Sequence, residues 1–255
     1  MGMTKLYQTE WNGISLYDIS NRLGKPLDII ASCDFYMEFY RQLSENGWDL
    51  QKEFLEDKKL LGKLVFSKIN PEKSDNIISL GAGLGICELE AIRGGYCVEL
   101  QEVQKDSFKY LDILGVEPAK VWITDDCSII LSDTYDYVIV NHLMYCFDDS
   151  QYKIFLNEVY RMLKEDGTLI ITAELYTEIA CIKNSISNIK ALRRVLGKNN
   201  NRVFWGYLRT VKKHVSMLSQ LFQVVDYGQL ENGSVSLDYS YYICKKSKQG
   251  VNVRI

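Results

Sequence analysis

The sequence is short of the features that mark long linkers, metal sites and membrane spans. It has only three prolines in 255 residues, and no low-complexity stretch divides it, so we expect one domain over residues 1–255. Its seven cysteines include no Cys-x-x-Cys pair, which argues against zinc or iron–sulfur sites and predicts free thiols. Residues 1–10 lack a signal-peptide pattern, and no apolar run is long enough to cross a bilayer. We therefore expect a soluble cytoplasmic protein without a bound metal.

A strong excess of positive charge is also missing. The 30 Lys and Arg residues face 33 Asp and Glu residues, which gives a net charge of -3. Because neutralising a phosphate backbone needs clustered cations, nucleic acid is not expected as the main partner. One stretch is locally basic, and both a solvated helix face and a site for an anionic substrate stay open for it. Its members are Lys183, Lys190, Arg193, Arg194, Lys198, Arg202, Arg209, Lys212 and Lys213.

The most informative feature is a glycine-rich corner near residue 80. The apolar residues 77–80 predict a short buried strand, glycines follow at positions 81, 83 and 85, and residues 86–92 predict a helix. A dinucleotide fingerprint requires G-x-G-x-x-G, but here Ile86 occupies the sixth position. A phosphate-binding loop has a lysine directly after its last glycine, and this chain has no basic residue there. The spacing therefore favours a nucleoside ligand that carries no phosphate.

Alternating strands and helices continue beyond this corner. We expect strands at residues 96–101, 119–124, 137–141 and 168–173, and an amphipathic helix at 150–163. Glu102 ends the second strand, 21 positions after Gly81, which is where a doubly wound fold holds ribose hydroxyls. Glu99 is a competitor, but it lies inside the strand. Polar residues at strand ends predict a site at one edge of a parallel sheet.

These residues resemble the class I S-adenosylmethionine-dependent methyltransferases over residues 75–175. Residues 80–85 are similar to the first motif of that family, residues 135–140 to its fourth-strand motif, and residues 160–169 to its R-x-L-K-x-G-G segment. Ser79 is a departure, because the family often has Asp or Glu at that position. Glu88 is a candidate for the missing carboxylate, or it simply complements the dipole of the next helix.

The resemblance implies a doubly wound (Rossmann-like) α/β fold with a mostly parallel seven-stranded sheet and an antiparallel edge strand. A helical N-terminal segment (1–70), a cofactor-binding core (71–175), a helical substrate cap (176–220) and terminal strands (221–255) complete the expected domain. Rings are frequent in the N-terminal segment, either as packing or as a cover over the site. The resemblance further implies S-adenosyl-L-methionine as cofactor, bound by Gly81, Ala82, Gly83, Gly85, Glu102, Asp126, Cys127 and Asn141.

His142, which follows the fourth strand, is the best candidate for a general base, and His214 is the only other histidine. A structural role stays open for both. Arg209 is the expected clamp for a carboxylate or phosphate, and no D/N-P-P-Y/F/W signature follows the fourth strand. We therefore expect O-methylation of a small molecule, such as a sugar or a secondary metabolite. Methylation of RNA or protein and a non-catalytic cofactor-binding module stay open, and the oligomeric state is not indicated. The candidate substrate contacts are Tyr145, Glu174, Tyr176 and Arg209.

Overall fold

A seven-stranded sheet forms the centre of the molecule. The computed structural model describes residues 2–11, 14–23, 33–47, 52–195, 202–232 and 235–246. The strand order is β10-β11-β8-β7-β4-β5-β6. Strand β11 runs antiparallel to both neighbours, while the pairs from β8 to β6 are parallel. This confirms the expected doubly wound sheet, with its antiparallel strand one place in from the edge strand β10. The strands are β4 (Ile77–Leu80), β5 (Val98–Glu102), β6 (Lys120–Ile123), β7 (Tyr135–Asn141), β8 (Leu163–Glu174), β10 (Phe222–Asn232) and β11 (Val235–Lys246).

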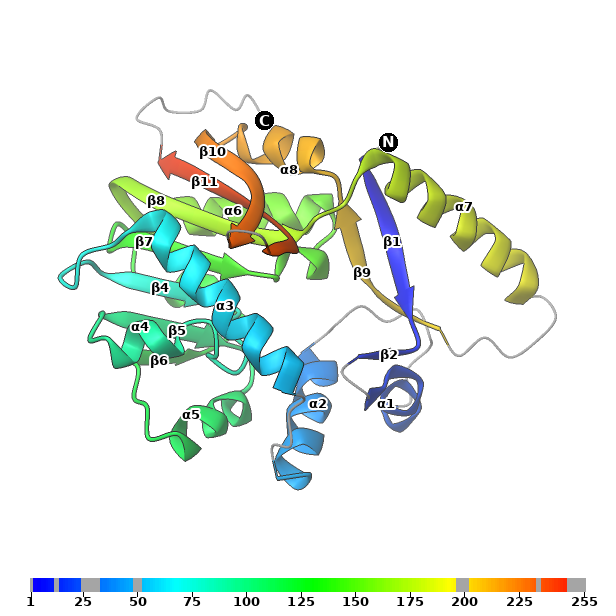
Figure 1. Cartoon of the computed structure of the whole chain (residues 1–255), viewed down its shortest axis with the longest axis horizontal. Helices are drawn as coiled ribbons and strands as arrows, with labels where there is room; N and C mark the ends of the chain where they lie inside the picture. The colour runs from blue at the N-terminus through cyan, green and yellow to red at the C-terminus, as the bar shows by residue number, and fades with distance from the viewer. Residues whose placement is uncertain are drawn as a thin grey trace.

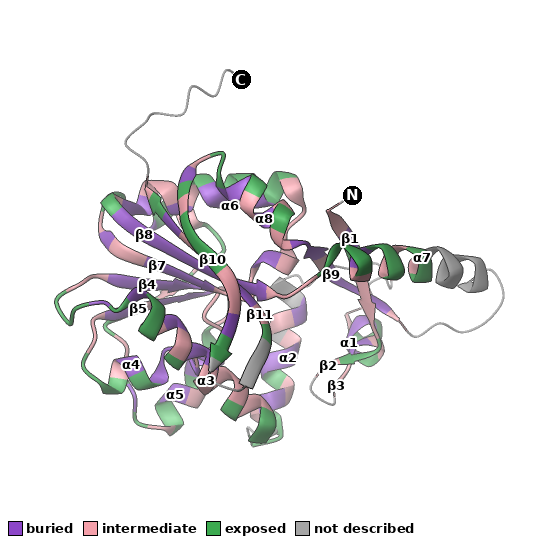
Figure 2. Ribbon diagram, turned by 45° about the horizontal axis from the view of Figure 1, so that its top comes forward, coloured by how far each residue is buried: buried purple, intermediate pink, exposed green. Residues whose placement is uncertain are grey.

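Helices cover both faces of this sheet (Figure 1). Strand β7 is apolar at successive positions because both faces of the sheet are buried there. Val138 and Val140 belong to the cluster on the α6 side, whereas Ile139 belongs to the cluster on the α3 side. Figure 2 shows the same central strands as largely buried. One face carries α6 (Asp149–Met162) and α8 (Val211–Leu218), and the other carries α3 (Lys52–Ile69), α4 (Leu89–Arg93) and α5 (Lys109–Ile113).

Helix α6 begins where its sequence provides a cap. The Asp148 carboxylate accepts hydrogen bonds from the backbone N–H groups of Ser150 and Gln151, both at 2.8 Å. The Gln151 side chain in turn accepts the Asp148 N–H, which completes a capping box. The sequence predicts an apolar stripe at residues 154, 156, 159, 162 and 163 of this segment. The last four are buried, but Ile154 is 66% exposed. Its neighbour Phe155 faces the core instead.

Outside the main sheet the chain contains strands as well as the expected helices. Strand β1 (Met3–Gln8) pairs antiparallel with β9 (Val203–Arg209), so the start of the chain and a segment about 200 residues later form a small second sheet. Strand β9 lies within the cap (176–220) that we expected to be helical, and it is rich in aromatic and β-branched residues, which favour strands. Helix α7 (Glu178–Val195) packs against β1. A hairpin of β2 (Glu10–Trp11) and β3 (Ile14–Ser15) leads into α1 (Leu16–Arg22) and then α2 (Cys33–Glu45).

Several other expectations can be compared with the described residues. The sequence also predicts that a helix begins near residue 26 and that another is interrupted at residues 197–201, and both positions lie outside the described residues. The six cysteines with described side chains are free thiols, and no group suited to hold a metal occurs in the part of the chain that the structure covers. None of the helices in the described ranges combines the length and the apolar character that a bilayer crossing requires.

Candidate functional site

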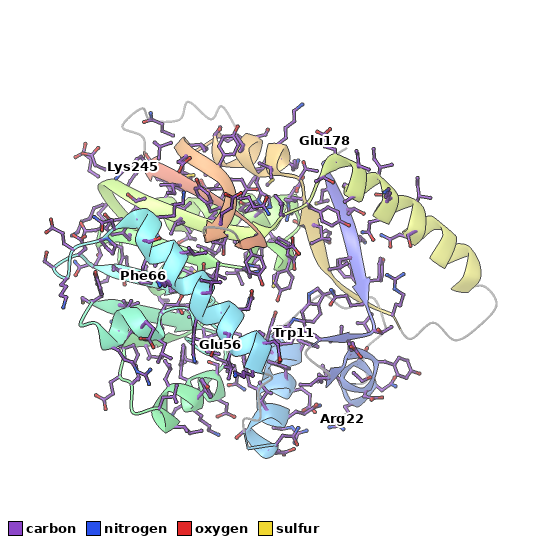
Figure 3. The ribbon with its side chains drawn as sticks, in the orientation of Figure 1. Trp11, Arg22, Glu56, Phe66, Glu178 and Lys245 are labelled. Atoms are coloured by element: carbon purple, nitrogen blue, oxygen red, sulfur yellow. The ribbon has the colours of Figure 1, made fainter. Side chains whose placement is uncertain are left out.

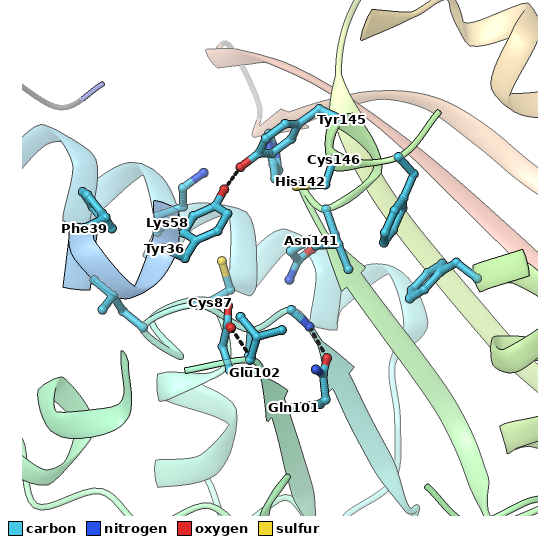
Figure 4. A pocket seen from close by; sticks show the side chains of 18 of the residues that line it. Tyr36, Phe39, Lys58, Cys87, Gln101, Glu102, Asn141, His142, Tyr145 and Cys146 are labelled. Atoms are coloured by element: carbon cyan, nitrogen blue, oxygen red, sulfur yellow. Dashed lines mark hydrogen bonds between the residues drawn. The ribbon is translucent and has the colours of Figure 1, made fainter. Parts of the chain in front are cut away.

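A cavity of about 890 Å³ opens at the carboxyl ends of β4, β5 and β7, beneath α2 and α3 (Figure 4). This volume is typical of small-molecule sites. Seven of the eight residues predicted to bind the cofactor lie on its wall, although they come from four strand ends (β4, β5, β6 and β7) and the loops that follow. These residues are Gly81, Ala82, Gly83, Glu102, Asp126, Cys127 and Asn141.

The glycine turn exposes main chain to the cavity at Gly83. Its φ of +60° is a left-handed conformation that favours glycine, and a Cβ there would point at the Tyr40 hydroxyl 3.4 Å away. Gly85 does not reach the cavity, which corrects its predicted role. A Cβ at Gly85 would lie 2.7 Å from Leu111 Cδ1, so this glycine lets the turn pack closely against the core. Gln101 is a wall residue that was not among the predicted site residues. Its side chain accepts the Gly81 N–H at 2.9 Å and donates to the Thr124 carbonyl.

Glu102 presents a buried carboxylate beside this turn. The Tyr40 hydroxyl donates to it at 3.5 Å. Burial raises the pKa of Glu102, while the backbone N–H groups of Val103, Gly83 and Gln104 act in the opposite direction. Its competitor Glu99 is engaged elsewhere, because it accepts hydrogen bonds from Trp122 Nε1 at 2.6 Å and Tyr135 Oη at 2.7 Å. Of the two carboxylates, only Glu102 lies on the cavity wall.

A buried polar network lies below the turn, around the departure at Ser79. The Ser79 hydroxyl donates to Glu88 Oε1 at 2.7 Å, and Asn141 Nδ2 donates to the same oxygen at 3.2 Å. Glu88 is 0% exposed, and burial raises its pKa to about 7. Thr172 Oγ1 donates to Asn141 Oδ1 at 3.0 Å, which fixes the amide. Glu88 thus brings a carboxylate from the start of α4 to the place beside Ser79.

His142 lies at the opposite side of the cavity from Glu102, directly after β7. Its φ is +53°, and its N–H donates to the Thr172 carbonyl at 3.1 Å. The imidazole packs edge-on against the Tyr239 ring, with 4.1 Å between centroids. Within the described residues, its buried Nε2 has no hydrogen-bond partner. Burial and the nearby Lys58 ammonium hold the pKa of His142 well below its usual value, so the ring is neutral and, in this buried state, a weak base.

Aromatic rings form the rest of the wall. Tyr145, a predicted substrate contact, stacks on Trp205 with 5.6 Å between centroids and shares a short hydrogen bond with the Tyr36 hydroxyl. Close approach of β9 is possible because residue 206 is glycine: a Cβ there would lie 2.5 Å from the Tyr145 carbonyl oxygen. The N-terminal rings therefore line the cavity in addition to packing on one another. The aromatic rings on the wall are those of Trp11, Tyr36, Phe39, Tyr40, Phe54, Tyr145, Phe147, Phe155, Trp205 and Tyr239.

Besides Gly85, three predicted site residues lie off this cavity, while Glu174 lies on its wall. Arg209 is 2% exposed and donates to Asp149 and to the carbonyls of Met144 and Phe147. It anchors the loop that carries Tyr145 rather than clamping a ligand. His214 is buried against Tyr152, and burial lowers its pKa to about 3. Tyr176 does not contribute to the wall. These placements correct the predictions of a mobile second base, an anion clamp and a tyrosine contact.

Comparison with solved structures identifies the architecture. Human N-acetylserotonin methyltransferase in complex with S-adenosylmethionine superposes with a TM-score of 0.60 at 15% identity, covering 90% of this chain and 62% of that one. Magnesium protoporphyrin IX methyltransferase from Synechocystis PCC 6803 gives 0.53 at 11% identity, covering 91% and 94%. A SAM-dependent methyltransferase from Methanosarcina mazei gives 0.55 at 15%, covering 71% and 96%. The fold is that of the class I methyltransferases. No protein-family model matches the sequence, and a search of curated proteins gave no significant match.

Proposed function

We propose that this protein is a S-adenosylmethionine-dependent methyltransferase that methylates a hydroxyl group of a small molecule. The observation that supports it most is the glycine turn at Gly83, which opens onto the large cavity with the Glu102 carboxylate at the end of the next strand. A turn of this kind admits a nucleoside close to the main chain, and the carboxylate suits two vicinal hydroxyls.

The residues present fit S-adenosylmethionine. Gly81, Ala82 and Gly83 are placed to contact its methionine and ribose portions, Glu102 to accept the ribose hydroxyls, and Asp126 with Cys127 to flank the adenine. Asn141, held by Glu88 and Thr172, is available for the amino-acid portion. When bound, this cofactor supplies an electrophilic methyl group to a nucleophile.

The chain contributes positioning and a proton acceptor. Aromatic walls hold an acceptor in a dry site, and alignment of reacting groups alone supplies ~7–11 kcal/mol of barrier reduction. His142 Nε2, which has no hydrogen-bond partner in the described structure, is the proposed acceptor of the hydroxyl proton as the new C–O bond forms. Burial and Lys58 hold its pKa well below the usual value, so this role requires the bound acceptor to reach Nε2 and raise that pKa.

A polymeric substrate has less support. Three members of the basic stretch are engaged within the protein: Arg209 is buried, Arg202 donates to the Tyr7 carbonyl and Lys213 pairs with Asp149. Among the other members with described side chains, Lys183 and Lys212 are exposed, and two scattered lysines are fewer than the clustered cations that a phosphate backbone requires. A non-catalytic module is also less consistent with the glycine turn and Glu102 being intact.

The proposal is tested by incubating the protein with methyl-labelled S-adenosylmethionine and a small-molecule extract. We expect a labelled small product and saturable cofactor binding by calorimetry; absence of both contradicts the proposal. His142→Gln should lower turnover by about 10²–10⁴-fold while leaving cofactor affinity within about twofold. Unchanged turnover in this variant removes the base but leaves the methyltransferase assignment intact.

A further inference from the structure

The charge on the cavity wall is strongly unbalanced. Lys58 is the one Lys or Arg on the wall within the described residues. Arg209, expected to provide a second cation, is held by Asp149 and two backbone carbonyls outside it. A low-dielectric cleft lined by one sign of charge concentrates ligands of the opposite sign. The carboxylates on the wall are Glu53, Asp57, Glu102, Asp125, Asp126, Glu158 and Glu174.

One of these acids is available on the acceptor side. Glu174 ends β8 and is half-buried, and its carboxylate makes no hydrogen bond within the described part of the chain. Asp57 differs, because it accepts a hydrogen bond from the Tyr239 hydroxyl at 2.6 Å and lies 3.9 Å from Lys58. Glu174 is therefore the half-buried carboxylate on this side without a hydrogen bond in the described residues, and the Lys58 ammonium is the charge that acts on it.

The rings around Glu174 are arranged to attract a cation. Lys58 Nζ already lies 5.2 Å from the centroid of the Tyr239 ring and 5.7 Å from that of Phe54. Figure 4 shows Lys58, Tyr36, His142 and Tyr145 together on the side of the cavity away from Gln101 and Glu102. Aromatic faces carry negative potential and bind ammonium groups, most strongly where water is excluded. Tyr145 and Trp205 stack on each other with nearly parallel rings, and a ligand ring can pack against this pair from the cavity side.

We propose that the methyl acceptor is a flat phenolic molecule that carries a protonated amine, with the ammonium group bound by Glu174 and the ring packed against the aromatic wall. The substrate class rests on the proposed function, since the hydroxyl must reach His142. Acceptors that carry a carboxylate or a phosphate are excluded by this proposal. The acceptor side presents two or more acids and a single lysine, which together repel an anion.

The proposal can be tested with three probes of similar size. Tyramine carries the ammonium group, 4-ethylphenol is neutral, and 3-(4-hydroxyphenyl)propionate carries a carboxylate. Their dissociation constants are measured by calorimetry or ligand-observed NMR on the whole chain, with and without S-adenosylhomocysteine. We expect tyramine to bind about tenfold tighter than the neutral probe, and the acid to bind more weakly than both.

Glu174→Gln should remove most of tyramine's advantage over 4-ethylphenol. Glu56→Gln is the matched control, since Glu56 lies on α3 outside the cavity and pairs with the exposed Lys59 (Figure 3). It should leave the preference unchanged. Three results overturn the proposal: binding of the acid as tight as that of the amine, an unchanged preference in Glu174→Gln, or no binding of any probe by protein that binds S-adenosylhomocysteine.

The cofactor titration separates this proposal from the proposed function. Protein that prefers tyramine but does not bind S-adenosylhomocysteine has the amine site and lacks the methyltransferase function. Protein that binds the cofactor but prefers the acid retains the function and contradicts the amine site.

Discussion

The two halves of the cavity are built in different ways. The half proposed to bind the cofactor, called the cofactor half, comes from one continuous stretch, in which β4, β5 and β7 end side by side and place Gly83, Glu102 and Asn141 at one edge. The half proposed to bind the methyl acceptor, called the acceptor half, joins Trp11, Tyr36 and other rings of the N-terminal segment with Trp205 and Tyr239, far along the chain. The first half depends on local sequence and strand order, and the second depends on long-range packing.

The halves also differ in chemistry. In the cofactor half, main-chain N–H groups and buried carboxylates contribute directional hydrogen bonds. In the acceptor half, ring contacts dominate: Trp11 lies 4.6 Å from Phe39 and 5.6 Å from Trp205, between centroids. Dispersion and apolar burial tolerate many partners, so this half can be changed for a new acceptor while the cofactor half is kept.

The largest expected effect comes from breaking the acceptor half. Trp205 is 4% exposed and contacts Trp11, Phe35 and Tyr145. Trp205→Ala leaves a cavity among these rings, and we expect the free energy of unfolding to fall by about 4 kcal/mol. Denaturant unfolding measures this loss, while calorimetry should find cofactor affinity within about threefold of wild type.

The matched control is Tyr227→Ala, which removes a ring that is 53% exposed on β10. It should change stability by less than about 0.5 kcal/mol. If Trp205→Ala also removes cofactor binding from folded protein, the two halves form one unit and the comparison fails.

The cofactor half can also be tested through the pKa of Glu88, which is buried below the glycine turn. Its pKa in the folded protein is about 7, against an ordinary value of 4.5. The folded state therefore retains this proton at a pH where the unfolded chain has lost it. The contribution of Glu88 to stability is fully present below pH 4.5 and is lost as the pH rises to about 7.

Glu88→Gln removes this loss and keeps an oxygen for Ser79. We expect the variant to gain up to about 3 kcal/mol relative to wild type between the two ends of that pH range. Denaturant unfolding across the range measures the gain, and the two proteins should differ least at the acid end. If the free energies of unfolding of Glu88→Gln and wild type change with pH in the same way, Glu88 is not buried as a neutral acid and the prediction is wrong.

The cofactor half could be predicted from the sequence because its signals are local. The apolar run before Gly81, the spacing to Glu102 and the end of β7 at Asn141 are each visible within a few residues. Gly85 was misplaced because spacing does not distinguish a glycine that faces a ligand from one that packs against Leu111.

The acceptor half could not be predicted in the same way. Nothing near Trp205 indicates that Gly206 lets its strand reach Tyr145, or that β1 pairs with β9. Arg209 and His214 were expected at the site from their residue types, but tertiary packing buries both. Lys58, Asp57 and Tyr239 were missed because helix α3 and strand β11 meet only in the folded protein.

Calorimetric titration of S-adenosylmethionine into wild type, Glu102→Ala and Glu99→Ala tests the central claim most directly. Removing the ligand's hydrogen bonds to a carboxylate costs about 2 kcal/mol, so Glu102→Ala should weaken binding roughly 30-fold. Glu99→Ala, from the same strand, should bind as wild type because Glu99 is engaged by Trp122 and Tyr135. Equal affinity of Glu102→Ala and wild type, or no binding by wild type, contradicts the account.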